Sequence, residues 1–319
     1  MLYTIDRVQY SKEYNLYYFY EFMELGNINI LLKNENELLP PDELWKALSN
    51  GVSETENNKI TFLKSIGSVT RIFIFYQQGL NKFIRIELNP RGIFGDVWSY
   101  VELQTWFKWL NNIDGQSNSK GLGSVRATHV DSYVNSLLQS IYEDSQFHDD
   151  NGLELTKSLL GSDSTKGFDL DLFQFIPSTK EYIIYEFLKR ENQHINNIQA
   201  HPMRYCWTGK WNDNKQKFIS LWKAKEFFNG KLLLISYSDD SSERISIIEV
   251  LDLDIDKGIL AEKKYSMSRN VFLGWLKDMS QYTNINQNNY FIDFKFNEYG
   301  EDFFGNFNEN KRNYGNEFL

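Results

Sequence analysis

Cysteine is nearly absent from this chain, and its scarcity excludes several classes of protein. The 319 residues include a single cysteine, Cys206, so an intrachain disulfide is impossible. One cysteine cannot build a cysteine-rich zinc site, and the four histidines lack the spacing of a zinc-protease helix. A chain without disulfides suits a reducing compartment, and we expect a cytoplasmic protein.

Long apolar runs are also missing, because charged residues or asparagine interrupt every strand-like segment. The first residues lack the basic and then apolar order of a signal peptide. We therefore expect no membrane association.

A positive charge balance is absent too: the formal net charge is −9, which opposes nucleic-acid binding through bulk charge but permits a local basic cleft.

Apolar and aromatic residues are plentiful, at 41% and 16% of the chain, so a packed core is expected. The glycine- and serine-rich segment 114–124 has the composition of a linker. We predict an N-terminal α+β domain over 1–113, serving recognition or dimerisation, and a second domain over 125–282. An asparagine- and aromatic-rich tail follows over 283–319, in which residues 287–296 could add an edge strand and weak order is expected beyond residue 300.

The second domain has an α/β pattern, in which helices alternate with pairs of strands. We expect a mixed sheet flanked by helices, including a helix over 215–228 that Gly230 ends. In the first domain, Ser99 and Glu102 predict a capping box. The segments 105–110 and 271–276 resemble each other; this could reflect two similar half-modules, but we favour a coincidence of amphipathic helices.

An acidic hairpin is the most informative segment of the sequence. Residues 168–176 and 181–189 are rich in β-branched and aromatic residues, and a proline–serine turn separates them. If Ile176 pairs with Glu181, Asp171 lies directly opposite Glu186. Like charges facing each other destabilise a sheet, and a divalent cation such as Mg²⁺ or Mn²⁺ would resolve the repulsion. The other interpretation is an exposed pair at a sheet edge, screened by neighbouring lysines.

With its helices and its paired acids, the segment from about 131 to 253 resembles the PD-(D/E)XK nuclease superfamily, which has the restriction-endonuclease-like fold. The resemblance implies that Asp171 and Glu186 bind the metal ion. It also implies a lysine two residues after the glutamate, which polarises the attacking water. Leu188 stands at that position in this chain, and Lys189 follows it.

Lys189 could reach the two acids only through a β-bulge, because the next residue of a regular strand points to the opposite face. We take Asp171, Glu186 and Lys189 as the catalytic set. A lysine from the next helix, Lys215 or Lys217, is the other source of the ammonium group.

Two further acids could support this site. Asp169 shares a strand face with Asp171, and Glu143 ends the preceding helix. Each also has a simpler interpretation, as a solvated strand end and as a surface glutamate.

The loop after the hairpin interleaves cations with aromatic residues and could contact phosphates and stack on bases. The alternative is a surface loop whose aromatic side chains pack on the sheet. The candidate nucleic-acid-binding residues are Arg190, Arg204, Tyr205 and Lys210.

These features predict a Mg²⁺-dependent endonuclease that cleaves double-stranded DNA, for example in restriction or phage defence, and that could act as a homodimer. The first alternative is a catalytically inactive nuclease-like module that binds nucleic acid or protein. The second is an interaction protein without metal. The position of the Lys189 ammonium group discriminates: toward the carboxylates it favours the enzyme, and away from them it favours the binding module.

Overall fold

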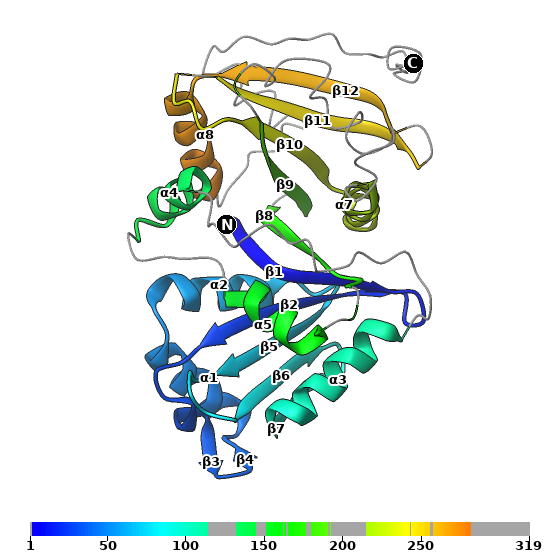
Figure 1. Ribbon diagram of the computed structural model, residues 1–319. Coiled ribbons are helices and arrows are strands. Elements are labelled where there is room, and N and C mark those ends of the chain that lie inside the picture. The colour runs from blue at the N-terminus through cyan, green and yellow to red at the C-terminus, as the bar shows by residue number, and fades with distance from the viewer. Residues whose placement is uncertain are drawn as a thin grey trace. The chain divides into compact units, whose positions relative to one another are not determined.

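The computed structural model describes residues 2–113, 132–144, 151–161, 163, 165–176, 180–190, 192, 215–242, 244–255 and 258–281. The chain has a mixed α/β fold, as the sequence predicts, and forms two compact units (Figure 1). The N-terminal unit consists of Thr4–Asn135 and Tyr142–Asp169; the C-terminal unit consists of Met1–Tyr3, Ser136–Ile141 and Leu170–Leu319. The predicted linker 114–124 and tail 283–319 lie outside the described residues.

The N-terminal unit is built on a mixed sheet with the strand order β1-β2-β5-β6-β7. Its strands are β1 (Leu2–Ser11), β2 (Leu16–Glu24), β5 (Thr70–Tyr76), β6 (Phe83–Asn89) and β7 (Gly92–Trp98), with a small separate hairpin of β3 (Leu32–Asn34) and β4 (Glu37–Leu38). Its helices are η1 (Ile28–Leu31), α1 (Pro41–Gly51), α2 (Glu54–Ser65), α3 (Tyr100–Asn112) and α5 (Asn151–Leu160).

The C-terminal unit is built on a sheet with the order β8-β9-β10-β11-β12. The strands are β8 (Phe168–Ile176), β9 (Glu181–Lys189), β10 (Lys231–Tyr237), β11 (Ile245–Asp254) and β12 (Gly258–Met267). The helices are α4 (Ser132–Tyr142), α7 (Lys215–Phe228) and α8 (Arg269–Gln281).

The two units repeat one connection order. Each begins with an antiparallel hairpin, β1–β2 or β8–β9. A helical crossover then leads into a strand parallel to the second one, as β5 is to β2 and β10 is to β9. Two antiparallel strands and a final helix complete each module. The described elements therefore form the same ββαβββα module twice.

The final helices α3 and α8 contain the two similar segments, 105–110 and 271–276. The first segment begins at the sixth residue of α3, whereas the second begins at the third residue of α8. Ser99 caps α3 in a capping box with Glu102, and hydrogen bonds from Ser99 hold the pKa of that carboxyl below its usual value. Ser268 directly precedes α8, where its hydroxyl accepts a 3.4 Å hydrogen bond from the Val271 N–H, and Trp106 and Trp275 are each the seventh residue of their helix. The half-module interpretation, which we did not favour from the sequence, thus agrees with the topology.

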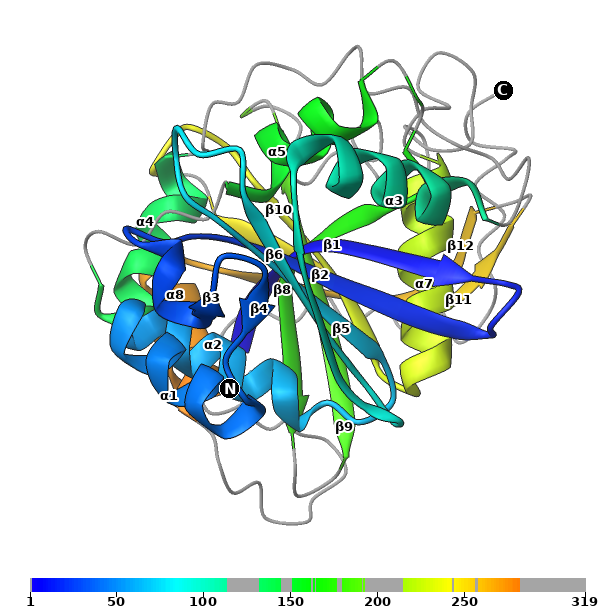
Figure 2. The ribbon, with the colours of Figure 1, turned by 90° about the horizontal axis from the view of Figure 1, so that it is seen from below.

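Helices cover both faces of the N-terminal sheet. Side chains of α3 and α5, such as Phe107 and Leu159, form a buried cluster with Tyr20 and Phe22 of β2. The opposite face lies against α1 and α2 (Figure 2). Since α5 packs in this unit, the unit extends past the predicted domain boundary and includes part of the segment 125–282.

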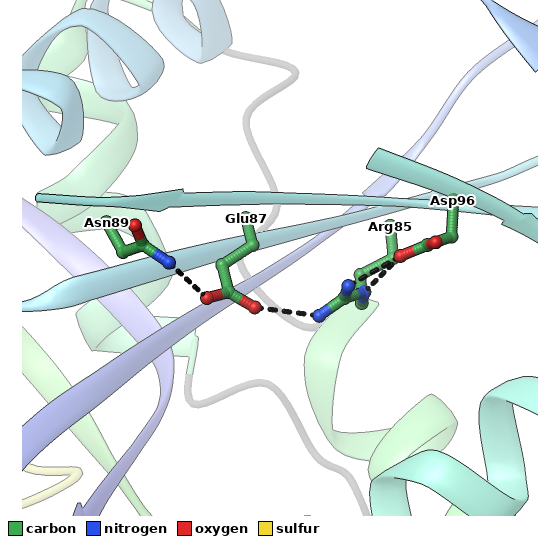
Figure 3. Close-up of polar contacts among 4 residues, drawn as sticks. All are labelled: Arg85, Glu87, Asn89 and Asp96. Carbon is green, nitrogen blue, oxygen red and sulfur yellow. Dashed lines mark hydrogen bonds and ion pairs between the residues drawn. The ribbon is translucent and has the colours of Figure 1, made fainter. Parts of the chain in front are cut away.

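An open series of polar contacts joins the last strand of this sheet, β7, to its neighbour β6. Arg85 of β6 donates hydrogen bonds to Asp96 of β7 and to Glu87, and Asn89 donates to the other oxygen of Glu87 (Figure 3). The Arg85 guanidinium also lies 4.8 and 4.9 Å from the ring centroids of Trp98 and Trp106. Both acids of this cluster pair with Arg85, and the cluster joins β6, β7 and α3, so we assign it a structural role.

In the C-terminal unit, α7 and α8 pack on opposite sides of the β8–β9 hairpin. Phe228 of α7 contacts Phe173 and Tyr182, whereas Trp275 of α8 contacts Tyr185, whose side chain points to the other face. Gln174 accepts a hydrogen bond from the Tyr185 hydroxyl and donates one to the Met279 carbonyl of α8. The α7 face is the one that carries the two predicted acids.

Candidate functional site

The acidic hairpin forms in the predicted register. The β8–β9 ladder runs from Ile176 opposite Glu181 to Leu172 opposite Tyr185. Asp171 and Glu186 occupy the next position, on adjacent strands and on the same sheet face. The Phe187 backbone N–H donates a 2.6 Å hydrogen bond to Asp171 Oδ2, which fixes that carboxylate against the neighbouring strand.

Lys217, from the first turn of α7, supplies the cation of this site. Its Nζ lies 2.8 Å from Glu186 Oε1 and 4.0 Å from Asp171 Oδ1. The Lys217 and Asp171 side chains are 25% and 20% exposed, whereas that of Glu186 is only 5% exposed. An ammonium group of the chain itself therefore relieves the repulsion of the two acids at a site that solvent partly reaches.

Lys189 points elsewhere. Its Nζ forms a 2.7 Å ion pair with Asp239, and its side chain is half-exposed. The β9–β10 ladder is continuous from Ile183 to Lys189, so the β-bulge that would turn Lys189 toward the acids does not form. Of the lysines considered from the sequence whose side chains the structure describes, Lys189 and Lys217, it is Lys217 that reaches the acids.

Two of the other predicted site residues are exposed in the described structure. Glu143 is exposed, has a φ of 55° and lies in the N-terminal unit. Asp169 is exposed on β8. The Arg190 backbone N–H bonds to the Tyr237 carbonyl, continuing the sheet. Lys215 begins α7, but its side chain lies outside the described residues, as do Arg204, Tyr205 and Lys210 entirely.

The predicted metal ion stays a prediction. Within the described residues no group of three acids, histidines or cysteines is placed to hold a metal ion, but Mg²⁺ often binds through only one or two carboxylates and completes its six oxygen ligands with water and phosphate. The Lys217 ammonium group lies against the carboxylates that such an ion would use. The ammonium already supplies the positive charge for which the metal was predicted.

The N-terminal unit contains the same charged group. Lys59 Nζ lies 2.6 Å from Glu21 Oε2 and 3.8 Å from Asp6 Oδ1. The Phe22 N–H donates a 2.8 Å hydrogen bond to Asp6 Oδ2, as the Phe187 N–H does to Asp171. Here, however, the side chains of all three charged residues are at most 8% exposed. We call the two arrangements the Asp6 group and the Asp171 group.

A repeat in the sequence underlies this similarity, and our sequence analysis missed it. Six residues of the first hairpin recur 165 positions later in the second: Asp6, Gln9, Tyr17, Tyr20, Glu21 and Phe22 correspond to Asp171, Gln174, Tyr182, Tyr185, Glu186 and Phe187. Gln9 donates to a carbonyl of the final helix α3, as Gln174 does to one of α8. A comparison of the chain with itself would have found these six residues.

Similarity to known proteins gives no assignment: no family model, no curated protein and no solved structure matches the chain. Among the described helices, none is long and apolar enough to cross a bilayer.

Proposed function

We propose that the protein is a non-catalytic binding module, made of two copies of one nuclease-like unit, whose partner is a protein. The observation that carries this proposal is the Asp6 group. It keeps the arrangement of the Asp171 group in a buried position, where neither a DNA strand nor bulk water reaches the acids. A role in stabilising the fold explains both the Asp6 group and the Asp171 group. Catalysis could explain only the Asp171 group, which solvent partly reaches.

The choice of a protein partner rests on charge and on exposed apolar side chains. A net charge of −9 opposes nucleic-acid binding through bulk charge. In the N-terminal unit, β7 and α3 pack together and expose several large apolar side chains. Exposed apolar surface of this kind is typical of protein–protein contacts. The exposed large apolar residues on these two elements are Ile93, Phe94, Val101 and Trp109.

A second candidate is the metal-dependent DNA endonuclease predicted from the sequence. The partial exposure of Lys217 and Asp171 favours it, because a substrate phosphate could approach this copy. In that function Asp171 and Glu186 would hold Mg²⁺ or Mn²⁺, and Lys217 would take the role expected of Lys189.

Calorimetric titration with Mn²⁺ separates the two candidates. We expect wild type and Glu186→Gln to give the same small heats, since the Lys217 ammonium occupies the carboxylates. Glu186→Gln preserves the shape of the side chain and removes its charge, so it is a matched control. Saturable Mn²⁺ binding by the wild type that Glu186→Gln abolishes would support the endonuclease instead.

A further inference from the structure

Both units close a pair of carboxylates around a lysine side chain that enters from the helix directly before the next strand of the sheet, α2 before β5 and α7 before β10. We propose that this arrangement is a binding site for a primary ammonium group, which the chain itself fills with Lys59 in the Asp6 group and with Lys217 in the Asp171 group. The site selects its ligand by hydrogen-bond geometry as well as by charge. This inference does not depend on the identity of the partner.

The contacts of Lys59 match the chemistry of an ammonium group. Such a group has three N–H donors and no acceptor. Lys59 Nζ donates to Thr4 Oγ1 at 3.0 Å, and it lies 2.6 Å from Glu21 Oε2 and 3.8 Å from Asp6 Oδ1. Three oxygen-bearing side chains thus surround three donors.

The acceptors are held in place by contacts that do not involve the lysine. Asp6 Oδ2 accepts from the Phe22 N–H, and Glu21 Oε1 accepts from the Asp6 N–H at 3.3 Å. Gly152 packs so closely on Asp6 that a Cβ atom there would lie 2.7 Å from the Asp6 Cβ. We therefore expect the acceptors to keep their positions when the ammonium is removed.

The second copy supports the same assignment in a more open form. Lys217 reaches the equivalent carboxylates from the third position of α7, whereas Lys59 is the sixth residue of α2. The lysine thus enters at different helical positions, but its ammonium group lies in the same place relative to the two acids. The exposure of Lys217 indicates that a small ligand from solvent could reach this copy.

Chemical rescue tests the proposal. Lys59→Ala and Lys217→Ala remove the ammonium and three of the four stem carbons, leaving a space that n-propylammonium chloride should refill. We expect each variant to melt at a lower temperature than wild type. Added n-propylammonium should raise the melting temperature of both variants in a saturable way and leave wild type unchanged.

Two matched compounds separate the contributions of the N–H donors, the charge and the aliphatic chain to the rescue. Tetramethylammonium carries the same charge without N–H donors, and n-propanol has the same chain without charge; neither should rescue a variant. Equal rescue by tetramethylammonium, or no rescue of a folded variant by n-propylammonium, would overturn the proposal. If Lys59→Ala does not fold, the same titration of Lys217→Ala, where the site is partly exposed, decides the outcome.

Discussion

Lys59→Met should destabilise the N-terminal unit by about 3–5 kcal/mol, because it leaves two buried carboxylates without their ammonium. Methionine keeps most of the volume of the lysine stem, so the loss reports on charge and hydrogen bonding rather than on a cavity. Thr4 loses its donor as well. The corresponding fall in melting temperature is on the order of 10 °C for a unit of this size.

Urea unfolding followed by circular dichroism measures this effect, and two controls calibrate it. Lys46→Met changes an exposed lysine of α1 and should stay within about 0.5 kcal/mol of wild type. Lys217→Met removes the ammonium of the more exposed copy and should cost about 1–2 kcal/mol, because solvent screens the remaining charges. A Lys59→Met protein as stable as the Lys46→Met control would contradict a structural role for the Asp6 group.

Arg7→Met should give the second large loss, about 2–4 kcal/mol in the free energy of unfolding. The Arg7 guanidinium is buried; burial lowers the pKa of Arg7 to about 10, and its attraction to Tyr20 only partly opposes this. It donates hydrogen bonds to Thr165 at 2.6 Å, Asn111 at 2.8 Å and Gln9 at 3.1 Å. The loss of these hydrogen bonds lowers the free energy of unfolding by more than the removal of the buried charge raises it.

The repeat offers a matched control for Arg7. Leu172 occupies the equivalent position in the C-terminal unit, where the Tyr185 hydroxyl satisfies Gln174 instead. Leu172→Met exchanges apolar residues of similar volume and should cost less than about 1.5 kcal/mol. Both variants can be measured by urea unfolding, and equal losses at the two positions would show that the Arg7 contacts contribute little.

Local chemistry explains which parts of the fold could be predicted from the sequence. The β8–β9 register follows from the turn and from alternating side chains, so Asp171 opposite Glu186 could be derived by counting. The bounds of α7 follow from its apolar spacing and from Gly230, and the cap of α3 follows from Ser99 and Glu102. Each of these features depends on a few neighbouring residues.

The parts that could not be predicted depend on distant residues. Lys59 and Lys217 are 158 residues apart, whereas the equivalent acids of the two units are 165 residues apart. The two spacings differ because the segments before α2 and α7 differ in length. No local pattern therefore shows which lysine reaches the acids. Strand β7 also lacks a local signal, since its exposed Ile93 and Phe94 are adjacent and do not alternate with polar residues.

Cleavage of supercoiled plasmid DNA in the presence of Mn²⁺ tests the central claim most directly, that these charged groups stabilise the fold and do not catalyse hydrolysis. Wild type, Glu186→Gln and Lys217→Met are compared at equal protein concentration after each is shown to be folded. Our account predicts no nicked or linear product above the background of a buffer control for any of the three. Cleavage by the wild type that both variants abolish would contradict it and would identify Asp171, Glu186 and Lys217 as a nuclease active site.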